Sequence, residues 1–348
     1  MNPSVASALL AAFLFGASTP LAKLLVGETS PWLLAGLLYF GSGAGLLLAR
    51  LVRDRGWRPS GLARAEWPWL AGAIVFGGML GPVALMYGLS RASAATASLL
   101  LNLEAVLTAL IAWVVFRENA GRRVVLGMAA IVAGGVVLSW PGKTGAVDAA
   151  GIAGPAAIAL ACLCWAIDNN LTRKVSAADA FFIAAVKGAI AGAINIALAL
   201  WLGDMLPGWG VTAAAMLAGL GGYGVSLVLF VLALRGLGTA RTGAYFSTAP
   251  FIGAAIALLL PGEAAAPAFW IATGLMAFGV WLHLTEHHEH EHVHEAIEHA
   301  HPHEHDAHHR HAHAPGEETA SPHAHLHRHA PLRHKHPHFP DIHHRHAH

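Results

Sequence analysis

The sequence predicts an all-α membrane protein with ten transmembrane helices in two inverted five-helix repeats, followed by a disordered histidine-rich C-terminal tail. Hydrophobic residues make up 55% of the 348-residue chain and charged residues only 12%, and the mean hydropathy is +0.53. The apolar runs approach the ~20 residues that a helix needs to cross a bilayer. All 25 histidines lie at or beyond His283, so the composition changes abruptly at that point.

The apolar runs are expected to be helices, because only helices and closed barrels satisfy their backbone polar groups inside a bilayer. They lack the alternation that barrel strands require. Tryptophan lies near the ends of several runs, where an amphipathic ring suits the headgroup level. The ten expected helices are residues 4–25, 32–51, 69–89, 92–116, 124–140, 152–171, 180–202, 211–234, 239–260 and 266–284.

The basic residues predict the orientation of these helices. Most basic residues lie in the loops on one side of the membrane, and the loops on the other side carry only Lys23, Arg91 and Lys143. The positive-inside rule therefore places both termini on the cytoplasmic side of a plasma or inner membrane. An even number of crossings agrees with this placement. The loops assigned to the cytoplasm carry Arg50, Arg53, Arg55, Arg58, Arg64, Arg117, Arg122, Arg123, Arg173, Lys174, Arg235 and Arg241.

The chain contains an internal repeat. A shift of 145 residues aligns YGLSRASAATASLLLNLEAVLTALIAWVVFRE with LALRGLGTARTGAYFSTAPFIGAAIALLLPGE, and a shift of 150 aligns FGASTPLAKL with WAIDNNLTRK. Because each unit has an odd number of helices, the second enters the membrane inverted, as is typical of secondary transporters. The predicted organisation is a first repeat at 1–142, a linker at 143–151, a second repeat at 152–284 and the tail at 285–348.

These motifs resemble those of the EamA-type drug/metabolite transporters, over roughly residues 4–284. The resemblance depends on NLEAVLTALIAWVVFRE, its counterpart STAPFIGAAIALLLPGE, and the glutamates that end the two blocks, Glu118 and Glu263. The family usually has proline directly after the glutamate of the first motif, where this chain has Ala105, whereas Pro250 keeps the pattern in the second half. The resemblance implies transport of a small organic solute, by export, through alternating access.

Glu104 is the first candidate for handling the solute, because an ionisable group inside a membrane helix is costly. It shares a helical face with Thr108, and this face is small and mildly polar. The carboxylate either takes up a proton or a cation, or is a structural group hydrogen-bonded to a neighbouring helix. The repeat places Tyr245 on the corresponding face, where it either lines a solute cavity or packs in the core.

Lys187 and Asn195 lie eight residues apart, which is about two helical turns, and so share one face of the seventh helix. Asp168 and Asn169, near the cytoplasmic end of the sixth helix, could supply a partner for Lys187, and a pair of Asp168 and Lys187 would offset the cost of burying either charge alone. The alternative for Lys187 is an extended side chain that reaches the membrane surface.

The repeat also aligns residues 18–20 (Ser-Thr-Pro) with residues 168–170 (Asp-Asn-Asn). One polar break is then expected near the outer face and one near the inner face. This pattern is consistent with a pair of gates.

The tail is predicted to bind divalent transition metals, namely zinc, nickel, cobalt or copper, because neutral imidazole is a good ligand and H-x-H spacing recurs. With few large apolar residues it is expected to stay disordered. A solvated low-complexity tail or a pH sensor are the alternatives. The candidate ligands are His287, His288, His290, His292, His294, His299, His301, His303, His305, His308, His309, His311 and His313.

The leading functional prediction is a secondary transporter of a small organic solute with a metal-binding cytoplasmic tail. One alternative is a nickel, cobalt or zinc transporter whose tail collects the ion, although no histidine precedes His283 to line a path. A second alternative is a membrane-anchored metal store or sensor. No enzyme activity, required cofactor or nucleic-acid partner is expected, and the protein is predicted to be a monomer or homodimer in a lipid bilayer.

Overall fold

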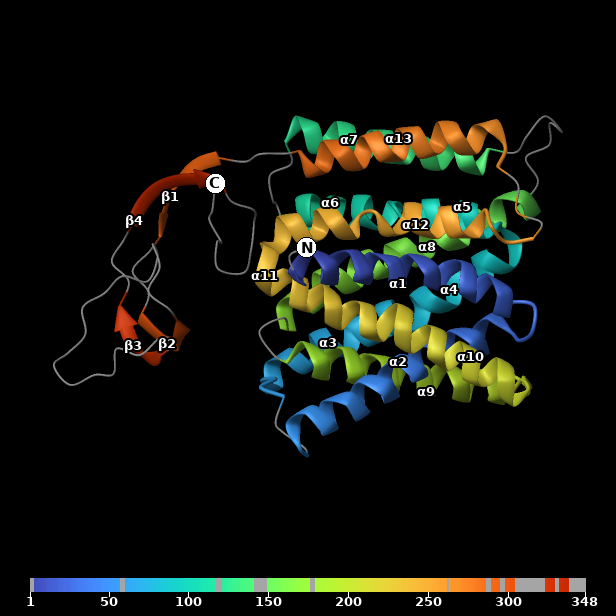
Figure 1. The fold of residues 1–348 in the computed structure, drawn as a ribbon, viewed down its shortest axis with the longest axis horizontal. Coiled ribbons are helices and arrows are strands. Elements are labelled where there is room, and N and C mark those ends of the chain that lie inside the picture. The colour runs from blue at the N-terminus through green and yellow to red at the C-terminus, as the bar shows by residue number, and fades with distance from the viewer. Residues whose placement is uncertain are drawn as a thin grey trace. The chain divides into compact units, whose positions relative to one another are not determined.

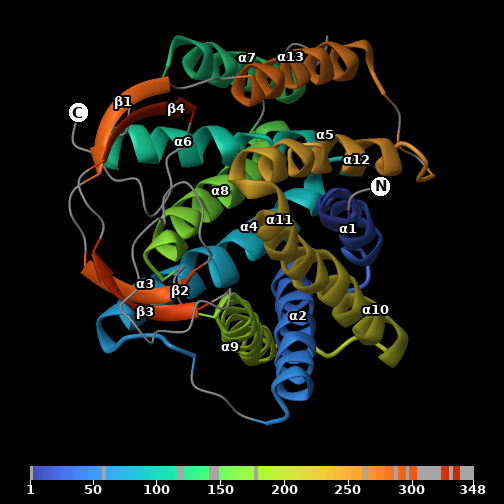
Figure 2. The same ribbon diagram turned by 60° about the vertical axis from the view of Figure 1, so that its left-hand side comes forward.

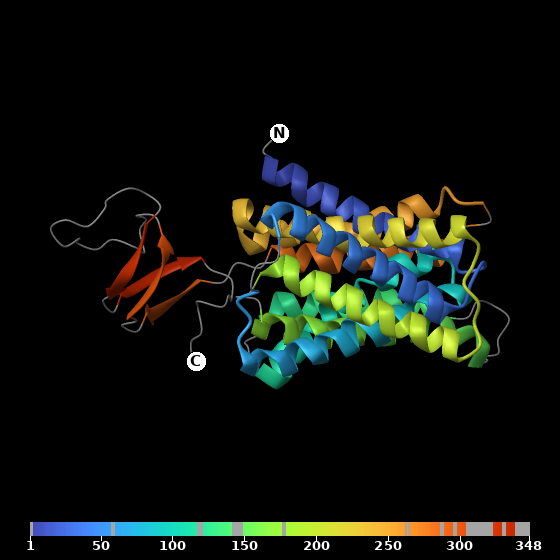
Figure 3. The same ribbon diagram turned by 90° about the horizontal axis from the view of Figure 1, so that it is seen from below.

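A computed structural model describes residues 3–56, 60–116, 121–140, 149–175, 179–261, 263, 265–285, 289–294, 298–303, 323–328 and 332–337. The chain divides into two compact units, Met1–Glu286 and His287–His348. The first unit is helical wherever it has regular structure in the described ranges, and Figures 1 and 3 show its helices running roughly alongside one another. This unit contains every apolar segment that the sequence predicts to span the membrane.

The helices of the first unit follow the predicted segments closely, with breaks inside several of them. Four short elements, η1 to η4, are 3-10 or π-helical and interrupt or extend α-helices. The elements are α1 Pro3–Leu25, α2 Pro31–Asp54, η1 Arg64–Glu66, α3 Trp67–Ala73, η2 Ile74–Leu80, α4 Gly81–Arg91, α5 Ala94–Leu100, α6 Leu103–Phe116, α7 Arg122–Ser139, α8 Ala149–Thr172, η3 Arg173–Val175, α9 Ala180–Trp201, α10 Trp209–Gly219, η4 Leu220–Val225, α11 Ser226–Phe246, α12 Ala249–Ala257 and α13 Pro267–Leu284.

Among the described residues, nine helical stretches are long and apolar enough to cross a membrane, where the sequence predicts ten. In the second half α11 runs from Ser226 to Phe246, through the connector expected between residues 234 and 239. In the first half, Ser93 ends the preceding helix and starts α5, since its Oγ accepts a hydrogen bond from the backbone N–H of Thr96 at 3.1 Å. The repeat places Gly238 at this position, and glycine has no side-chain oxygen to cap a new helix.

Two irregularities recur at equivalent places in the two halves, which supports the repeat. The break between α5 and α6 at Leu101–Asn102 corresponds to the break between α11 and α12 at Ser247–Thr248, 145 or 146 residues later. The π-helices η2 and η4 are related by the same shift. Because π-helical turns are rare, their appearance at matching positions indicates a conserved irregularity of the repeat unit and not a local accident.

The two halves are interleaved. The first helix of each half packs on the other half: α1 contacts α11 and α12, and α8 contacts α4 and α6. Figures 1 and 2 show α7 beside α13 at one edge of the bundle and α2 beside α9 towards the opposite edge. Each half therefore completes its packing with helices from the other.

Glycines allow these helix pairs to approach closely. A Cβ on Gly43 of α2 or on Gly188 of α9 would overlap the backbone of the other helix, and the same holds for Gly127 of α7 and Gly279 of α13. Small residues at such contacts are the usual means of packing membrane helices, since the bilayer supplies no hydrophobic force between them.

The second unit contains four short strands: β1 Glu289–His294, β2 Glu298–His303, β3 His323–Arg328 and β4 Leu332–Pro337. β1 pairs with β4 and β2 with β3, both antiparallel. Two-stranded pairings are marginally stable in water. The rest of the tail lies outside the described residues.

Candidate solute and ion site

Glu104 lies in the first turn of α6, directly after the break at Leu101–Asn102, and its backbone N–H donates to the carbonyl of Leu101 at 3.1 Å. Its Oε1 accepts a hydrogen bond from Nδ2 of Asn169 on α8 at 2.9 Å. The same Nδ2 lies 3.4 Å from Oγ1 of Thr108, one turn further along α6. The structure thus brings together three of the predicted site residues, with the amide of Asn169 between the two polar groups of α6.

The charge of Glu104 has no basic partner among the salt bridges of the described residues. Its hydrogen-bond partner is the neutral amide of Asn169. A carboxylate inside a membrane span is expensive to keep ionised without a counter-charge. This arrangement suits a group that is neutralised by a proton or by a positively charged ligand.

Asp168 and Lys187 form an ion pair between α8 and α9. Lys187 Nζ donates to Oδ2 of Asp168, and Oγ1 of Thr172 donates to the other carboxylate oxygen at 2.9 Å. The side chains are 6% and 20% exposed, so most of both is removed from the surface. The two charges of the pair offset each other, and Glu104 is not a member of this ion pair.

The π-helix η2 lies against this ion pair. Gly77 faces the Asp168 carboxylate so closely that a Cβ there would overlap it, and Gly78 faces Lys187 and Ala191. Pro82 follows, and because proline has no N–H it cannot satisfy the carbonyl of Gly77 or Gly78 within the helix. The absence of a side chain at both glycines is what allows α8 and α9 to approach.

The carbonyl of Gly77 instead accepts two side-chain hydrogen bonds, from Tyr39 Oη at 2.9 Å and from Trp165 Nε1 at 3.0 Å. Sequence analysis did not single out Tyr39, Trp165 or the glycine pair. Two adjacent glycines shortly before a proline inside one span are the signal that could have indicated a freed carbonyl here.

Asn195 is fully buried, with 0% of its surface exposed. Its Nδ2 lies 3.4 Å from the carbonyl oxygen of Gly78 and 3.3 Å from that of Met79, while its Oδ1 has no hydrogen-bond partner within the described structure. The predicted face of Lys187 and Asn195 therefore packs on η2.

Tyr245, the remaining predicted site residue, is not part of the polar cluster around Glu104. It lies in the last turn of α11 and is partly buried, and its carbonyl accepts a hydrogen bond from Thr248 Oγ1 at 2.6 Å. In the described part of the chain, no hydrogen bond joins it to Glu104, Asn169 or Thr108. The polar cluster is thus built from α6, α8, α9 and η2.

The paired helices α2 and α9 are tied at both ends by polar contacts. Asp179 caps the start of α9 and accepts from Nε of Arg50 at 2.9 Å and from Nη2 of Arg53 at 3.1 Å. At the opposite end, Ser30 caps the start of α2 and its Oγ donates to Asp204. The cap residue of each helix therefore binds the far end of its neighbour.

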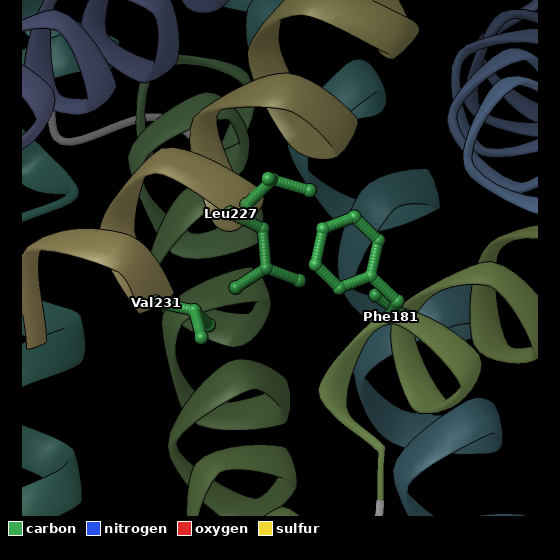
Figure 4. Close-up of a pocket in the computed structure, with 5 residues that line it drawn as sticks. Phe181, Leu227 and Val231 are labelled. Atoms are coloured by element: carbon green, nitrogen blue, oxygen red, sulfur yellow. The ribbon is translucent and has the colours of Figure 1, made fainter. Parts of the chain in front are cut away.

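An apolar hollow lies between α9 and α11, next to the Asp179 cap. Figure 4 shows the Phe181 ring facing Leu227, with Val231 one turn along α11. Its lining has no polar group, so it offers shape but no recognition chemistry. Its lining residues are Phe181, Ala184, Leu227, Val228 and Val231.

The predicted metal ligands of the tail fall only partly in the described ranges. Three lie in β1 and three in β2, and the other seven lie outside the described residues. No group of three or more His, Cys, Asp or Glu side chains in the described segments is positioned to hold a metal ion. The ligands in β1 are His290, His292 and His294, and those in β2 are His299, His301 and His303.

Two inverted, interleaved halves of apolar helices with buried polar groups between them define an integral membrane protein of the transporter class. The chain belongs to the EamA-like transporter family, whose model matches residues 2–140 and 152–285. This match confirms the resemblance inferred from the sequence motifs.

Two further comparisons found one similar transporter sequence and one similar fold. An uncharacterized transporter of Methanothermobacter thermautotrophicus is 25% identical over 277 residues, which cover 74% of this chain and 79% of that protein. A protein known from a crystal structure superposes with a TM-score of 0.58 at 21% identity, covering 80% of this chain and 95% of its own. At that identity the superposition shows a shared fold and carries no information on substrate.

Proposed function

We propose that the protein is a secondary transporter that exports a small organic solute from the cytoplasm by alternating access, with Glu104 as the ionisable group that the solute or a coupling proton neutralises. Both termini lie on the cytoplasmic side of a plasma or inner membrane in this proposal. The observation that carries it is the Glu104 carboxylate, which lies inside a membrane span and is bonded to the Asn169 amide without a basic partner among the described salt bridges.

The physical argument is one of charge. An ionised Glu104 is costly in a water-poor site, and either protonation or a cationic group of the solute removes that cost. If the proton must leave Glu104 before the solute binds, the protein exchanges protons for solute, and the proton gradient drives export of the solute. Asn169 donates to the carboxylate and holds it in place in either state.

Reconstituted protein tests this role. Vesicles loaded with a pH-sensitive dye are given an inward or outward proton gradient, and a panel of amino acids, nucleosides, sugars and quaternary ammonium compounds is added from outside. A transported and proton-coupled compound changes the luminal pH beyond the leak of empty vesicles. We expect Glu104→Gln to abolish that change and Glu104→Asp to retain part of it.

The matched control is Glu28→Gln, which removes an exposed carboxylate outside the membrane spans and should leave coupled flux unchanged. Solute flux that stays coupled to protons in Glu104→Gln would contradict the assigned role. Absence of flux for every compound in the wild-type protein would contradict transport of these solute classes.

We also propose that the tail binds divalent transition-metal ions. Its support is compositional: histidines recur at H-x-H spacing in a segment with few large apolar residues. The metal is then a ligand of the tail and not the cargo of the helical unit.

A further inference from the structure

The connector between α4 and α5, residues 89–95, contains two helix ends. The last carbonyls of α4 and the first N–H groups of α5 have no partner inside their own helices, as at every helix end. Ser93 satisfies part of this need, since its Oγ accepts from the N–H of Thr96 and its carbonyl from that of Ala97. The remaining groups require partners from elsewhere in the chain.

Lys23 supplies the donor for the end of α4. It lies partly buried in the last turn of α1, and its Nζ donates to the carbonyl of Leu89 at 2.6 Å and to that of Ala92 at 2.9 Å. A cation beside the C-terminal end of a helix also meets the negative end of the helix dipole. The last turn of α1 is therefore joined to the end of α4 by a charged side chain.

Glu263 supplies the acceptor for the start of α5. It follows α12, in the second half of the chain, and its Oε1 accepts from the N–H of Ala94 at 2.7 Å, while its Oε2 lies 3.4 Å from the N of Ala95. Gly154 of α8 packs on the same connector, since a Cβ there would come within 3.2 Å of the backbone of Arg91. Both halves of the chain thus converge on the α4–α5 connector.

The short helix α5 links this connector to the Glu104 site. It has seven residues, which span about 10 Å along the helix axis. The break at Leu101–Asn102 follows it, and Glu104 lies in the first turn of α6. Nδ2 of Asn102 donates to the carbonyl of Leu99 at 2.9 Å and so ties the break to α5. A displacement of α5 is therefore passed to the segment that carries Glu104.

The second half lacks the equivalent contacts. The repeat aligns residues 89–95 with residues 234–240, which lie inside the continuous helix α11. The N–H and C=O groups of a continuous helix bond to one another, so a charged side chain finds no helix end there. An inverted repeat places this stretch at the opposite end of the bundle. In the described part of the chain the two ends therefore differ, as alternating access requires of any single state.

We propose that Lys23 and Glu263 form a latch that closes the outer end of the protein, and that both side chains release the α4–α5 connector when this end opens to let the solute out. The latch rests on the proposed transport function and on its orientation in the membrane. Neither side chain belongs to an ion pair of the described residues. Release therefore strands no opposite side-chain charge, and water entering the opened end solvates both groups.

Labelling of one introduced cysteine tests whether the latch holds the outer end closed. Ser98 of α5 is 1% exposed, and a Cβ on Gly253 of α12 would lie 3.0 Å from its Oγ. Because Glu263 directly follows α12, separation of α5 from this region uncovers residue 98. The full-length Ser98→Cys protein in right-side-out vesicles is treated with a membrane-impermeant maleimide, and the rate of labelling is recorded.

We expect slow labelling of Ser98→Cys while the latch is intact. Adding Lys23→Met or Glu263→Gln should raise the rate by about tenfold or more, since a hydrogen bond to a charged group is strong enough to shift an equilibrium by that factor. Lys23→Arg keeps a cation that can donate to the same carbonyls and should keep the rate low. This conservative variant distinguishes the charged contact from the mere shape of the side chain.

Two variants at the same end of the bundle are matched controls. Arg91→Met removes an exposed cation of the same connector, which lies over the Tyr87 ring at 4.7 Å and not on a helix end. Glu28→Gln removes an exposed carboxylate between α1 and α2. Both should leave the labelling rate of Ser98→Cys unchanged.

Protein that retains Ser98 gives the background, because both native cysteines, Cys162 and Cys164, are buried. A rate that stays low in Lys23→Met and Glu263→Gln would overturn the latch. Equally fast labelling of the native cysteines in these variants would also overturn it, since the charges would then hold the whole fold and not one gate.

Failure of the latch is distinct from failure of the transport function. Solute flux in the wild-type protein, together with unchanged labelling in the variants, keeps transport and rejects the latch. Faster labelling in the variants without flux of any solute keeps the opening of the outer end and rejects the transport assignment.

Discussion

Gly77 of η2 lies in such close contact with Asp168 of α8 that a Cβ at residue 77 would overlap the carboxylate. The repeat reproduces this contact: Gly222, which is equivalent to Gly77, faces the side chain of Ser18, which is equivalent to Asp168. In each half, therefore, a glycine of the π-helix contacts a polar side chain from the first helix of the other half. Both predicted polar breaks, at residues 18–20 and 168–170, pack against a π-helix in this way.

Gly77→Ala is expected to destabilise the protein by about 1–3 kcal/mol, as overpacked core sites do. Asp168 cannot withdraw freely, because Lys187 and Thr172 hold both carboxylate oxygens. Thermal unfolding measures the effect. Gly221→Ala in η4 is the control, since a Cβ there meets no atom within 4 Å, and an equal loss in both variants would show that helical glycine itself, and not the contact, matters.

The Asp168 and Lys187 pair should show strong coupling between substitutions. Removing one partner leaves a buried unpaired charge, which typically costs about 3–5 kcal/mol, whereas removing both leaves none. We expect Asp168→Asn and Lys187→Gln each to lower stability strongly, and the double variant to recover much of the loss. Additive losses in this double-mutant cycle would argue that the pair contributes little.

Asp179 should make stability depend on pH in the acid range. Burial raises the pKa of Asp179, but hydrogen bonds from Arg50 and Arg53 and the backbone N–H of Phe181 outweigh it and hold that pKa below its ordinary value of 3.8. A carboxyl with a lowered folded-state pKa stabilises fully above its unfolded pKa, and the contribution is lost as pH falls through the folded value. The loss should therefore begin only below about pH 4.

The measurement is the unfolding temperature of the wild-type protein and of Asp179→Asn from neutral pH downward. The variant should be less stable than the wild type at neutral pH, and the gap should close as the pH falls below the ordinary value. A gap that is constant across this range would show that the charge of Asp179 does not account for the effect.

The sequence predicted those parts of the fold that require a particular kind of residue, such as an apolar or a charged one, at particular positions. Apolar length located the spans, the 145-residue shift located the repeat, and the cost of buried charge indicated that Asp168 and Lys187 should pair. The Asn169 contact with Glu104 was not foreseen as a bond, although both residues were candidates. It depends on how α6 and α8 are rotated, which apolar helices do not encode in a periodic pattern.

The π-helices and the continuous α11 could not be predicted in this way. An i to i+5 hydrogen bond leaves no periodic signature in a segment that is apolar on all sides, as η2 is. The repeat places Gly238 of α11 where the first half has the capping Ser93. Tyr39 was overlooked because its role is to donate to a carbonyl, which only the backbone irregularity makes available.

Removal of the tail separates its metal binding from the function of the helical unit. Cells that express the full chain, a chain stopped after Leu284, and Glu104→Gln are compared for growth in nickel, cobalt and zinc and for cellular content of each metal. If the tail is a metal ligand and the helical unit carries an organic solute, truncation should alter metal content or tolerance, and Glu104→Gln should behave as the full chain does.

The opposite pattern would assign the metal as cargo. A Glu104→Gln variant that abolishes the change in metal content with the tail intact would mean that the ion passes through the helical unit, against the proposal. The helical unit has few suitable ligands for such a path, since no histidine precedes His283 and both cysteines are buried. Transition-metal flux would then have to depend on carboxylates and backbone oxygens, which these ions bind less well than imidazole or thiolate.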